Sequence, residues 1–213
     1  MKVDKKSMLL YVVTDRTWLG ENSLSNQVEE IIKAGATFIQ LREKNLSFNE
    51  FVEEAERIKK ITDKYRVPFV INDDIQVALK VDADGVHVGQ SDMTAQDVRK
   101  LIGPDKILGV SAQTVAQAVE AEKNGADYLG VGAVFNTSTK LDADDVSYET
   151  LQAICRSVSI PVVAIGGINK DNISRLKGSG IAGVAVVSAI FAQPDVSEAT
   201  SALFHIAKGA FWS

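Results

Sequence analysis

The sequence predicts a single-domain α/β protein with the (β/α)8 TIM-barrel fold. Eight short runs rich in β-branched residues recur along the chain, and amphipathic stretches lie between them with apolar residues three and four positions apart. This alternation is typical of a parallel sheet covered by helices. Because short units fill 213 residues without a change in composition, one closed barrel is favoured over an open doubly wound sheet. The domain spans residues 1–213, and residues 1–8 could form a loosely ordered N-terminal extension.

Each strand is expected where apolar β-formers cluster. The expected strands are 9–15, 37–43, 68–73, 85–89, 107–112, 128–134, 161–167 and 183–189. The even-numbered strands follow small-residue turns at 34–38, 82–86, 124–128 and 179–183, in which glycine suits the end of a helix. Two odd strands instead open with Pro68 and Pro161, which a first strand position tolerates. Amphipathic periodicity predicts helices over 49–65 and 114–125, and the segment 168–176 is expected to begin another.

Composition indicates a soluble globular protein. Hydrophobic residues make up 46% of the chain and charged residues 24%. The net charge of -5 argues against general nucleic-acid binding but allows anionic ligands in a locally basic cleft. With Cys155 as the only cysteine, no intrachain disulfide can form. No apolar stretch reaches the roughly 20 residues that span a membrane, and no signal peptide is recognised, so a cytoplasmic location is expected.

Polar residues gather at the carboxyl ends of the expected strands, which in a barrel open into one mouth. Their chemistry fits a phosphorylated ligand, because cations, hydroxyls and glycine turns all bind phosphate oxygens. The cations are Arg42, Lys44 and Lys140, the hydroxyl run comprises Thr137, Ser138 and Thr139, and the glycines are Gly166 and Gly167. The helix expected from residue 168 would add an N-terminus that attracts anions.

Two carboxylates on neighbouring strand ends, Asp73 and Asp92, could hold one Mg²⁺ ion between them. Each feature also has a structural interpretation. Arg42 and Lys44 could form a solvated charge cluster with Glu43, and 137–140 could be a polar loop. Asp73 and Asp92 could cap the helices that follow them, although Asp74 is the better candidate for the first cap. Because all these residues recur at successive strand ends, the functional interpretation is favoured.

General bases are scarce at these strand ends. His87 sits inside a strand, where a satisfied core or barrel-lining histidine is the favoured interpretation, and His205 lies on the terminal helix. No catalytic triad, zinc spacing or Walker loop is evident. A site rich in phosphate binders and poor in bases indicates chemistry driven by stabilisation of a leaving group.

Ordered motifs along the chain resemble those of the thiamine phosphate synthases. They are YVVTDR, QLREKN, INDD, DGVHVGQSD, GVSAQT, GAVFNTSTK, VAIGGI and GVAVVSAI, between about residues 11 and 190. The resemblance implies that a pyrimidine diphosphate is joined to a thiazole phosphate, in its plain or carboxylated form, by a dissociative reaction assisted by Mg²⁺. It implies a pyrimidine diphosphate site of Gln40, Leu41, Arg42, Glu43, Lys44, Asn72, Ser111 and Lys140. Within that set Arg42, Lys44, Ser111 and Lys140 would be catalytic. It further implies a thiazole phosphate site of Thr137, Ser138, Thr139, Gly167, Val187 and Ser188, with Asp73 and Asp92 as metal ligands.

Two positions depart from the pattern of this family. Asn136 replaces the proline common before the hydroxyl run, which would loosen that loop, and Gln113 stands where many relatives have histidine. That histidine transfers protons in the related thiazole tautomerases, so its absence weakens a tautomerase assignment. The alternatives that stay open are such a tautomerase and a non-catalytic barrel that only binds a phosphate ligand. Small-molecule substrates are the expected partners, without nucleic acid or membrane, and a homo-oligomer is compatible with the sequence.

Overall fold

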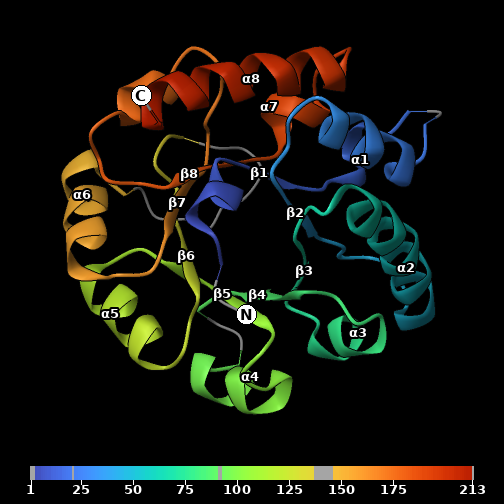
Figure 1. Cartoon of the computed structure of the whole chain (residues 1–213), viewed down its shortest axis with the longest axis horizontal. Coiled ribbons are helices and arrows are strands. Elements are labelled where there is room, and N and C mark those ends of the chain that lie inside the picture. The colour runs from blue at the N-terminus through green and yellow to red at the C-terminus, as the bar shows by residue number, and fades with distance from the viewer. Residues whose placement is uncertain (1–2, 21, 91–92, 137–145, 213) are drawn as a thin grey trace.

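The chain folds into a closed ring of eight parallel strands surrounded by helices (Figure 1). The structure, a computed structural model, describes residues 3–20, 22–90, 93–136 and 146–212. The strands are β1 (Leu10–Val13), β2 (Phe38–Leu41), β3 (Phe69–Asn72), β4 (Gly85–Val88), β5 (Ile107–Ala112), β6 (Tyr128–Val131), β7 (Val162–Ile165) and β8 (Gly183–Val186). Each strand pairs with its neighbour in sequence, and β1 pairs with β8 to close the ring. The predicted fold class is confirmed.

Helices cover the outside of the ring, and the α-helices of the described residues, apart from α7, begin at side-chain caps. The α-helices are α1 (Leu24–Lys33), α2 (Phe48–Tyr65), α3 (Ile75–Lys80), α4 (Ala95–Ile102), α5 (Val115–Lys123), α6 (Tyr148–Ser157), α7 (Ser188–Phe191) and α8 (Val196–Phe211). Short 3-10 helices are η1 (Lys5–Met8), η2 (Arg16–Trp18) and η3 (Ile173–Leu176). In α2, the Ser47 side chain and Glu50 satisfy each other's backbone amides in a capping box. The helices predicted over 49–65 and 114–125 correspond to α2 and α5.

The connection between β7 and β8 differs from the prediction. The segment 168–176 was expected to begin a helix, but it forms only the four-residue η3. Asparagine side chains compete with helix formation here, because Asn172 Oδ1 accepts a bond from the Asn169 backbone amide and its Nδ2 donates to the Gly167 carbonyl. These local bonds hold the chain in a turn, so the predicted anion-attracting helix N-terminus is wrong.

Two apolar layers lie on either side of the barrel wall. Alternate strand residues point outward and form the larger layer with the helices, where Leu41 and Val86 are fully buried. The inward-pointing residues form a smaller cluster inside the ring, which includes Met8, Tyr11, Phe38 and Tyr128. Met8 comes from η1, which lies over the centre of the ring in Figure 1. The barrel is therefore a packed core at this end.

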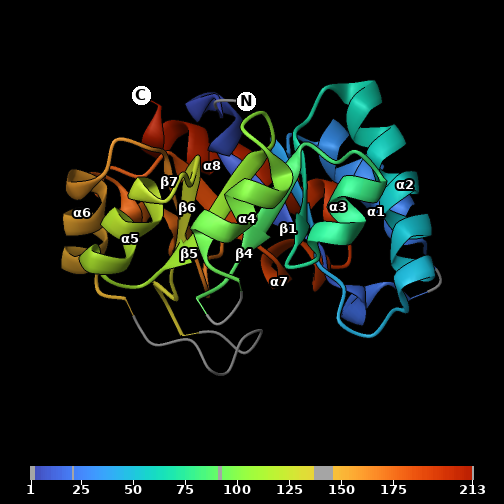
Figure 2. The same ribbon diagram turned by 90° about the horizontal axis from the view of Figure 1, so that it is seen from below.

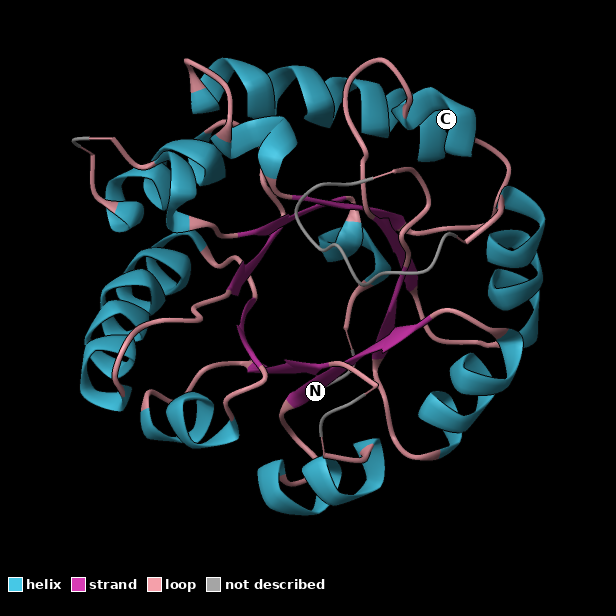
Figure 3. Ribbon diagram, turned by 180° about the vertical axis from the view of Figure 1, so that it is seen from behind, coloured by secondary structure: helices cyan, strands magenta, loops and turns pink. Residues whose placement is uncertain are grey.

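The carboxyl ends of the strands form the opposite end of the barrel. In Figure 2 the segments that follow β1 and β8, η2 and α7, lie at the lower side, whereas both marked termini lie at the upper side. Figure 3 looks at the ring from behind, with the helices arranged around it. Among the helices of the described residues, none is both long and apolar enough to cross a bilayer.

Candidate active site

A cavity of about 450 Å³ opens at the carboxyl ends of the strands. Ten residues predicted from the sequence to bind substrate, metal or phosphate line this one cavity, although they come from five different strand ends. They are Gln40, Arg42, Lys44, Asn72, Asp73, Ser111, Gly166, Gly167, Val187 and Ser188. The expectation that these strand ends would share one mouth is confirmed.

Side chains alternate in direction along β2 and the residues that follow it, so some face the cavity and others face the outer apolar layer. Gln40, Arg42 and Lys44 line the cavity. Leu41 is fully buried in the outer apolar layer, and the Glu43 side chain is 5% exposed and paired with Arg16. The family resemblance had extended the pyrimidine diphosphate site to Leu41 and Glu43. Their side chains lie outside the cavity, because successive residues of an extended chain point to opposite faces.

A chain of hydrogen bonds crosses the interior of the barrel below the cavity. Gln40 Nε2 donates to the Tyr11 hydroxyl at 2.5 Å, and the hydroxyls of Tyr11 and Tyr128 are 2.7 Å apart. His87 Nδ1 is 2.9 Å from the Tyr128 hydroxyl, and His87 Nε2 is 3.0 Å from Ser111 Oγ. Both ring nitrogens of His87 are thus engaged, as expected for a barrel-lining histidine. The chain therefore connects five strands, which are β1, β2, β4, β5 and β6.

Two glycines make room for the rings of this chain. A Cβ atom on Gly109 would lie 2.2 Å from Tyr128 Cζ and 2.5 Å from His87 Nδ1. A Cβ atom on Gly130 would lie 3.1 Å from His87 Cε1. A side chain at Gly109 would collide with both rings, and one at Gly130 would press against His87, so these positions of β5 and β6 are part of the site's construction.

Tyr11 and Tyr128 were not among the residues predicted for the site. Burial is the main cause that raises the pKa of each hydroxyl well above its ordinary value, so both stay protonated as neutral hydrogen-bonding groups. The signal that could have found them is their period-two spacing from inward-facing positions on β1 and β6, which marks polar-tipped aromatics inside the ring.

Two neighbouring aspartates have different environments. Asp74 accepts a bond from the Val77 backbone amide at 2.9 Å and caps α3, as predicted. Asp73 borders the cavity, and its φ of 63° is in the left-handed region that non-glycine residues rarely adopt. Asn72 Nδ2 donates to Asp73 Oδ2 at 2.5 Å. The unusual backbone therefore separates a carboxylate at the cavity from a carboxylate that serves the helix.

The turn after β7 brings backbone close to the cavity. Gly166 and Gly167 have φ values of 98° and 64°, and a Cβ atom on Gly167 would lie 2.4 Å from the Asn136 carbonyl oxygen. At the end of the neighbouring strand, Val187 and Ser188 follow β8 at the start of α7. These segments offer backbone amides rather than charged side chains.

Five predicted site residues lie outside the described part of the chain. They are Asp92, Thr137, Ser138, Thr139 and Lys140. Among the described residues, no group of three or more histidine, cysteine, aspartate or glutamate side chains is placed to hold a metal, and Asp73 is the acidic residue at the cavity. Gln113 also lines the cavity.

Comparisons with known proteins agree with these features. The family model described as thiamine monophosphate synthase matches residues 10–190. A protein of Ruminiclostridium cellulolyticum named thiamine-phosphate synthase is 57% identical, with 92% of this chain and 94% of that protein covered. One of Clostridium beijerinckii with the same name is 55% identical, with 91% and 93% covered.

A solved structure supports the same relationship. Thiamine phosphate pyrophosphorylase from Pyrococcus furiosus superimposes with a TM-score of 0.90 at 42% identity, covering 97% of this chain and 98% of that one. Family match, sequence identity and structural likeness extend over nearly the whole chain. The chain belongs to the thiamine monophosphate synthase family.

Proposed function

We propose that this protein joins 4-amino-2-methyl-5-hydroxymethylpyrimidine diphosphate to a thiazole phosphate, which yields thiamine phosphate and diphosphate. Its membership of the family supports this reaction. The observation that carries the proposal is the pair of cations at the cavity. Arg42 and Lys44 both line it, and within the described residues neither side chain makes an ion pair or a hydrogen bond. Two cations without partners beside a neutral polar interior suit a diphosphate.

The proposed reaction breaks the bond between the pyrimidine methylene carbon and the diphosphate oxygen before a new bond forms. The electron pair leaves with diphosphate, and the aminopyrimidine carries the resulting cation. The thiazole nitrogen then donates its lone pair to that carbon. Such a reaction needs charge stabilisation on the leaving group rather than a general base. The engagement of both His87 ring nitrogens by Tyr128 and Ser111 is consistent with this requirement.

Arg42, Lys44 and Lys140 would bind the diphosphate, with Gln40, Asn72 and Ser111 as neutral contacts. Ser111 is well placed for such a contact because its hydroxyl lies at the cavity end of the hydrogen-bond chain. The thiazole phosphate would bind backbone amides near Gly167, Val187 and Ser188, together with the hydroxyls of Thr137, Ser138 and Thr139. The cavity-facing glycine turn supports this close backbone approach.

Asp73 and Asp92 would hold Mg²⁺. The residue types at the described part of the cavity fit a hard cation, because Asp73, Asn72 and Gln90 line it and their side chains carry carboxylate and amide oxygens. When bound, Mg²⁺ would neutralise charge that develops on the departing diphosphate.

The test is to mix the purified protein with both substrates, with Mg²⁺ or with EDTA, and to follow thiamine phosphate by chromatography and diphosphate release. Metal-dependent formation of both products is the expected result. If the folded protein instead isomerises the thiazole phosphate, the tautomerase assignment is correct. If it only binds the thiazole phosphate, the protein is a non-catalytic binder.

A further inference from the structure

Glu43 stands between the two cavity cations in sequence but is turned away from them. Arg42 and Lys44 line the cavity, whereas the Glu43 side chain is 5% exposed and points to the outer side of the β2 continuation. Because successive residues of an extended chain point to opposite faces, the buried Glu43 carboxylate needs a cationic partner from another element, since an unpaired buried charge is costly. Among the described residues, Glu43 makes its ion pair with such a partner.

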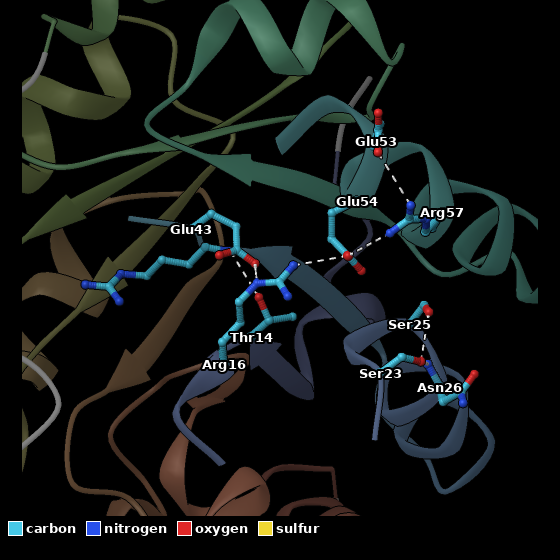
Figure 4. Close-up of polar contacts among 10 residues, drawn as sticks. Thr14, Arg16, Ser23, Ser25, Asn26, Glu43, Glu53, Glu54 and Arg57 are labelled. Carbon is cyan, nitrogen blue, oxygen red and sulfur yellow. Dashed lines mark hydrogen bonds and ion pairs between the residues drawn. The ribbon is translucent and has the colours of Figure 1, made fainter. Parts of the chain in front are cut away.

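That partner is Arg16, which lies between two buried carboxylates (Figure 4). Arg16 Nε donates to Glu43 Oε1 at 2.5 Å, and Arg16 Nη2 is 3.1 Å from Glu54 Oε2. Arg16 belongs to η2 after β1, and Glu54 belongs to α2. The guanidinium thus joins the segment after β2 to the segment after β1 and to the helix behind them.

Burial and a neighbouring carboxylate both disfavour the charged form of Glu43, and Arg16 favours it. Burial is the main cause that raises the pKa of Glu43, Arg16 acts in the opposite direction, and the nearby charge of Glu54 raises it further. Glu54 Oε1 is itself buried without a hydrogen-bond partner in the described part of the chain. Without Arg16, two buried carboxylates would repel each other, and the uncompensated charge of Glu43 would lie between two residues, Arg42 and Lys44, that line the cavity.

We propose that Arg16 is a positioning residue that withholds the Glu43 carboxylate from Arg42 and Lys44, so that both cations stay available to a diphosphate group. The ligand class rests on the proposed function. Arg16 itself is absent from the cavity lining and acts through Glu43. Its contribution is therefore electrostatic, and removing the charge of Glu43 makes it unnecessary.

A double-mutant cycle tests this directly, with inorganic diphosphate and Mg²⁺ as the probe and isothermal titration calorimetry as the readout. Arg16→Gln should raise the Kd for diphosphate about tenfold, since Glu43 then neutralises part of the cationic pair. The double variant Arg16→Gln with Glu43→Gln should regain most of that loss. Glu43→Gln alone should bind diphosphate at least as tightly as the unaltered protein.

Arg57→Gln is the matched control. Arg57 also contacts Glu54, at 3.4 Å, but its side chain is 58% exposed and it does not contact Glu43. This variant removes the same charge and should change the Kd by less than about twofold, as expected for an exposed pair. An equal loss in Arg57→Gln would show that general charge, rather than Glu43, sets the affinity.

The result that would overturn the proposal is a loss in Arg16→Gln that persists in the double variant, because Arg16 would then act through the fold alone. If Arg16→Gln does not fold, Arg16→Lys provides the second test. A lysine keeps the charge beside Glu43 and should keep diphosphate binding within about threefold of the unaltered protein. A loss as large as tenfold in a folded Arg16→Lys variant would contradict the charge argument.

Failure of the proposed function is distinguishable from failure of this inference. Diphosphate binding needs no thiazole and no turnover. A protein that follows the cycle but forms no thiamine phosphate would keep the inference and lose the proposed reaction. If the protein forms thiamine phosphate but the double variant does not recover diphosphate affinity, the proposed reaction is kept and the inference about Arg16 is lost.

Discussion

The hydroxyl groups of Tyr11 and Tyr128 lie 2.7 Å apart inside the barrel, although 117 residues separate them in the chain. Both side chains are essentially inaccessible to solvent. Gln40 is hydrogen-bonded to the Tyr11 hydroxyl and His87 to the Tyr128 hydroxyl. The two tyrosines therefore connect two residues that line the cavity. A buried hydroxyl that loses its partner keeps its desolvation cost, which makes this pair sensitive to deletion of either oxygen.

We predict that Tyr128→Phe destabilises the protein by about 1–3 kcal/mol, because it removes one hydrogen-bond partner from the buried Tyr11 hydroxyl and one from the His87 ring. Urea unfolding followed by circular dichroism measures the change. Tyr148→Phe is the control, since the Tyr148 hydroxyl donates to the Lys177 carbonyl at an exposed position. It should cost less than about 0.5 kcal/mol. Equal costs in the two variants would contradict the prediction.

Gly167→Ala should lower turnover at least about tenfold, since a methyl group would displace backbone at the cavity by contact with the Asn136 carbonyl oxygen. Gly20→Ala separates this effect from backbone strain, because Gly20 has a similar φ of 57° but no atom within 4 Å of its added Cβ. The control should cost only about 1–2 kcal/mol of stability. Steady-state kinetics and thermal unfolding of both variants distinguish the two effects.

Asp73→Asn should change the Mg²⁺ requirement of the protein, whereas Asp74→Ala should change its stability. Loss of the Asp73 carboxylate should raise the Mg²⁺ concentration needed for half-maximal activity, because a charged ligand is removed. Asp74→Ala should lower the free energy of unfolding by about 1 kcal/mol through loss of the α3 cap, with the Mg²⁺ requirement unchanged. Activity titrated with Mg²⁺ and urea unfolding measure the two effects. A shifted Mg²⁺ requirement in Asp74→Ala would contradict the assignment of the metal to Asp73 and of the helix cap to Asp74.

Lys44→Ala and Lys140→Ala should each reduce turnover at least about tenfold, because each removes a cation expected to stabilise the departing diphosphate. Lys100→Ala is the control, since Lys100 pairs with Asp97 on the exposed side of α4. Single-turnover kinetics measures the effect on the chemical step. Near-normal turnover would remove the altered lysine from the catalytic group.

Cys155 should react slowly with iodoacetamide. Burial raises its pKa to about 11 from an ordinary value of 9.0, so the thiolate fraction at pH 8 is about 100-fold smaller than in the unfolded chain. Alkylation of native and urea-unfolded protein, followed by mass spectrometry, measures this difference. Because the folded pKa is the higher one, the stability associated with this thiol is complete below pH 9 and is lost as the pH rises towards 11. Equal rates in the two states would contradict the assigned burial.

Local patterns in the sequence were sufficient for the ring of strands and for much of the cavity. Period-two alternation identifies Gln40, Arg42 and Lys44 as one face, and the same alternation could have separated Glu43 from them. Asp74 could be assigned to its cap because an N-cap bond spans only three residues. The connection between β7 and β8 could not be assigned from the sequence. Side-chain bonds of Asn169 and Asn172 form a turn there, although the apolar spacing favours a helix.

The sequence by itself determined the barrel fold, the approximate position of each strand and the chemistry gathered at the carboxyl ends. Only the tertiary structure decided which distant groups meet: Tyr11 with Tyr128 inside the ring, and Arg16 with Glu43 behind the cavity. Periodicity specifies the direction in which a side chain points, but not what lies there. That depends on closure of the barrel, which places residues from separate strands and loops within hydrogen-bond distance of each other.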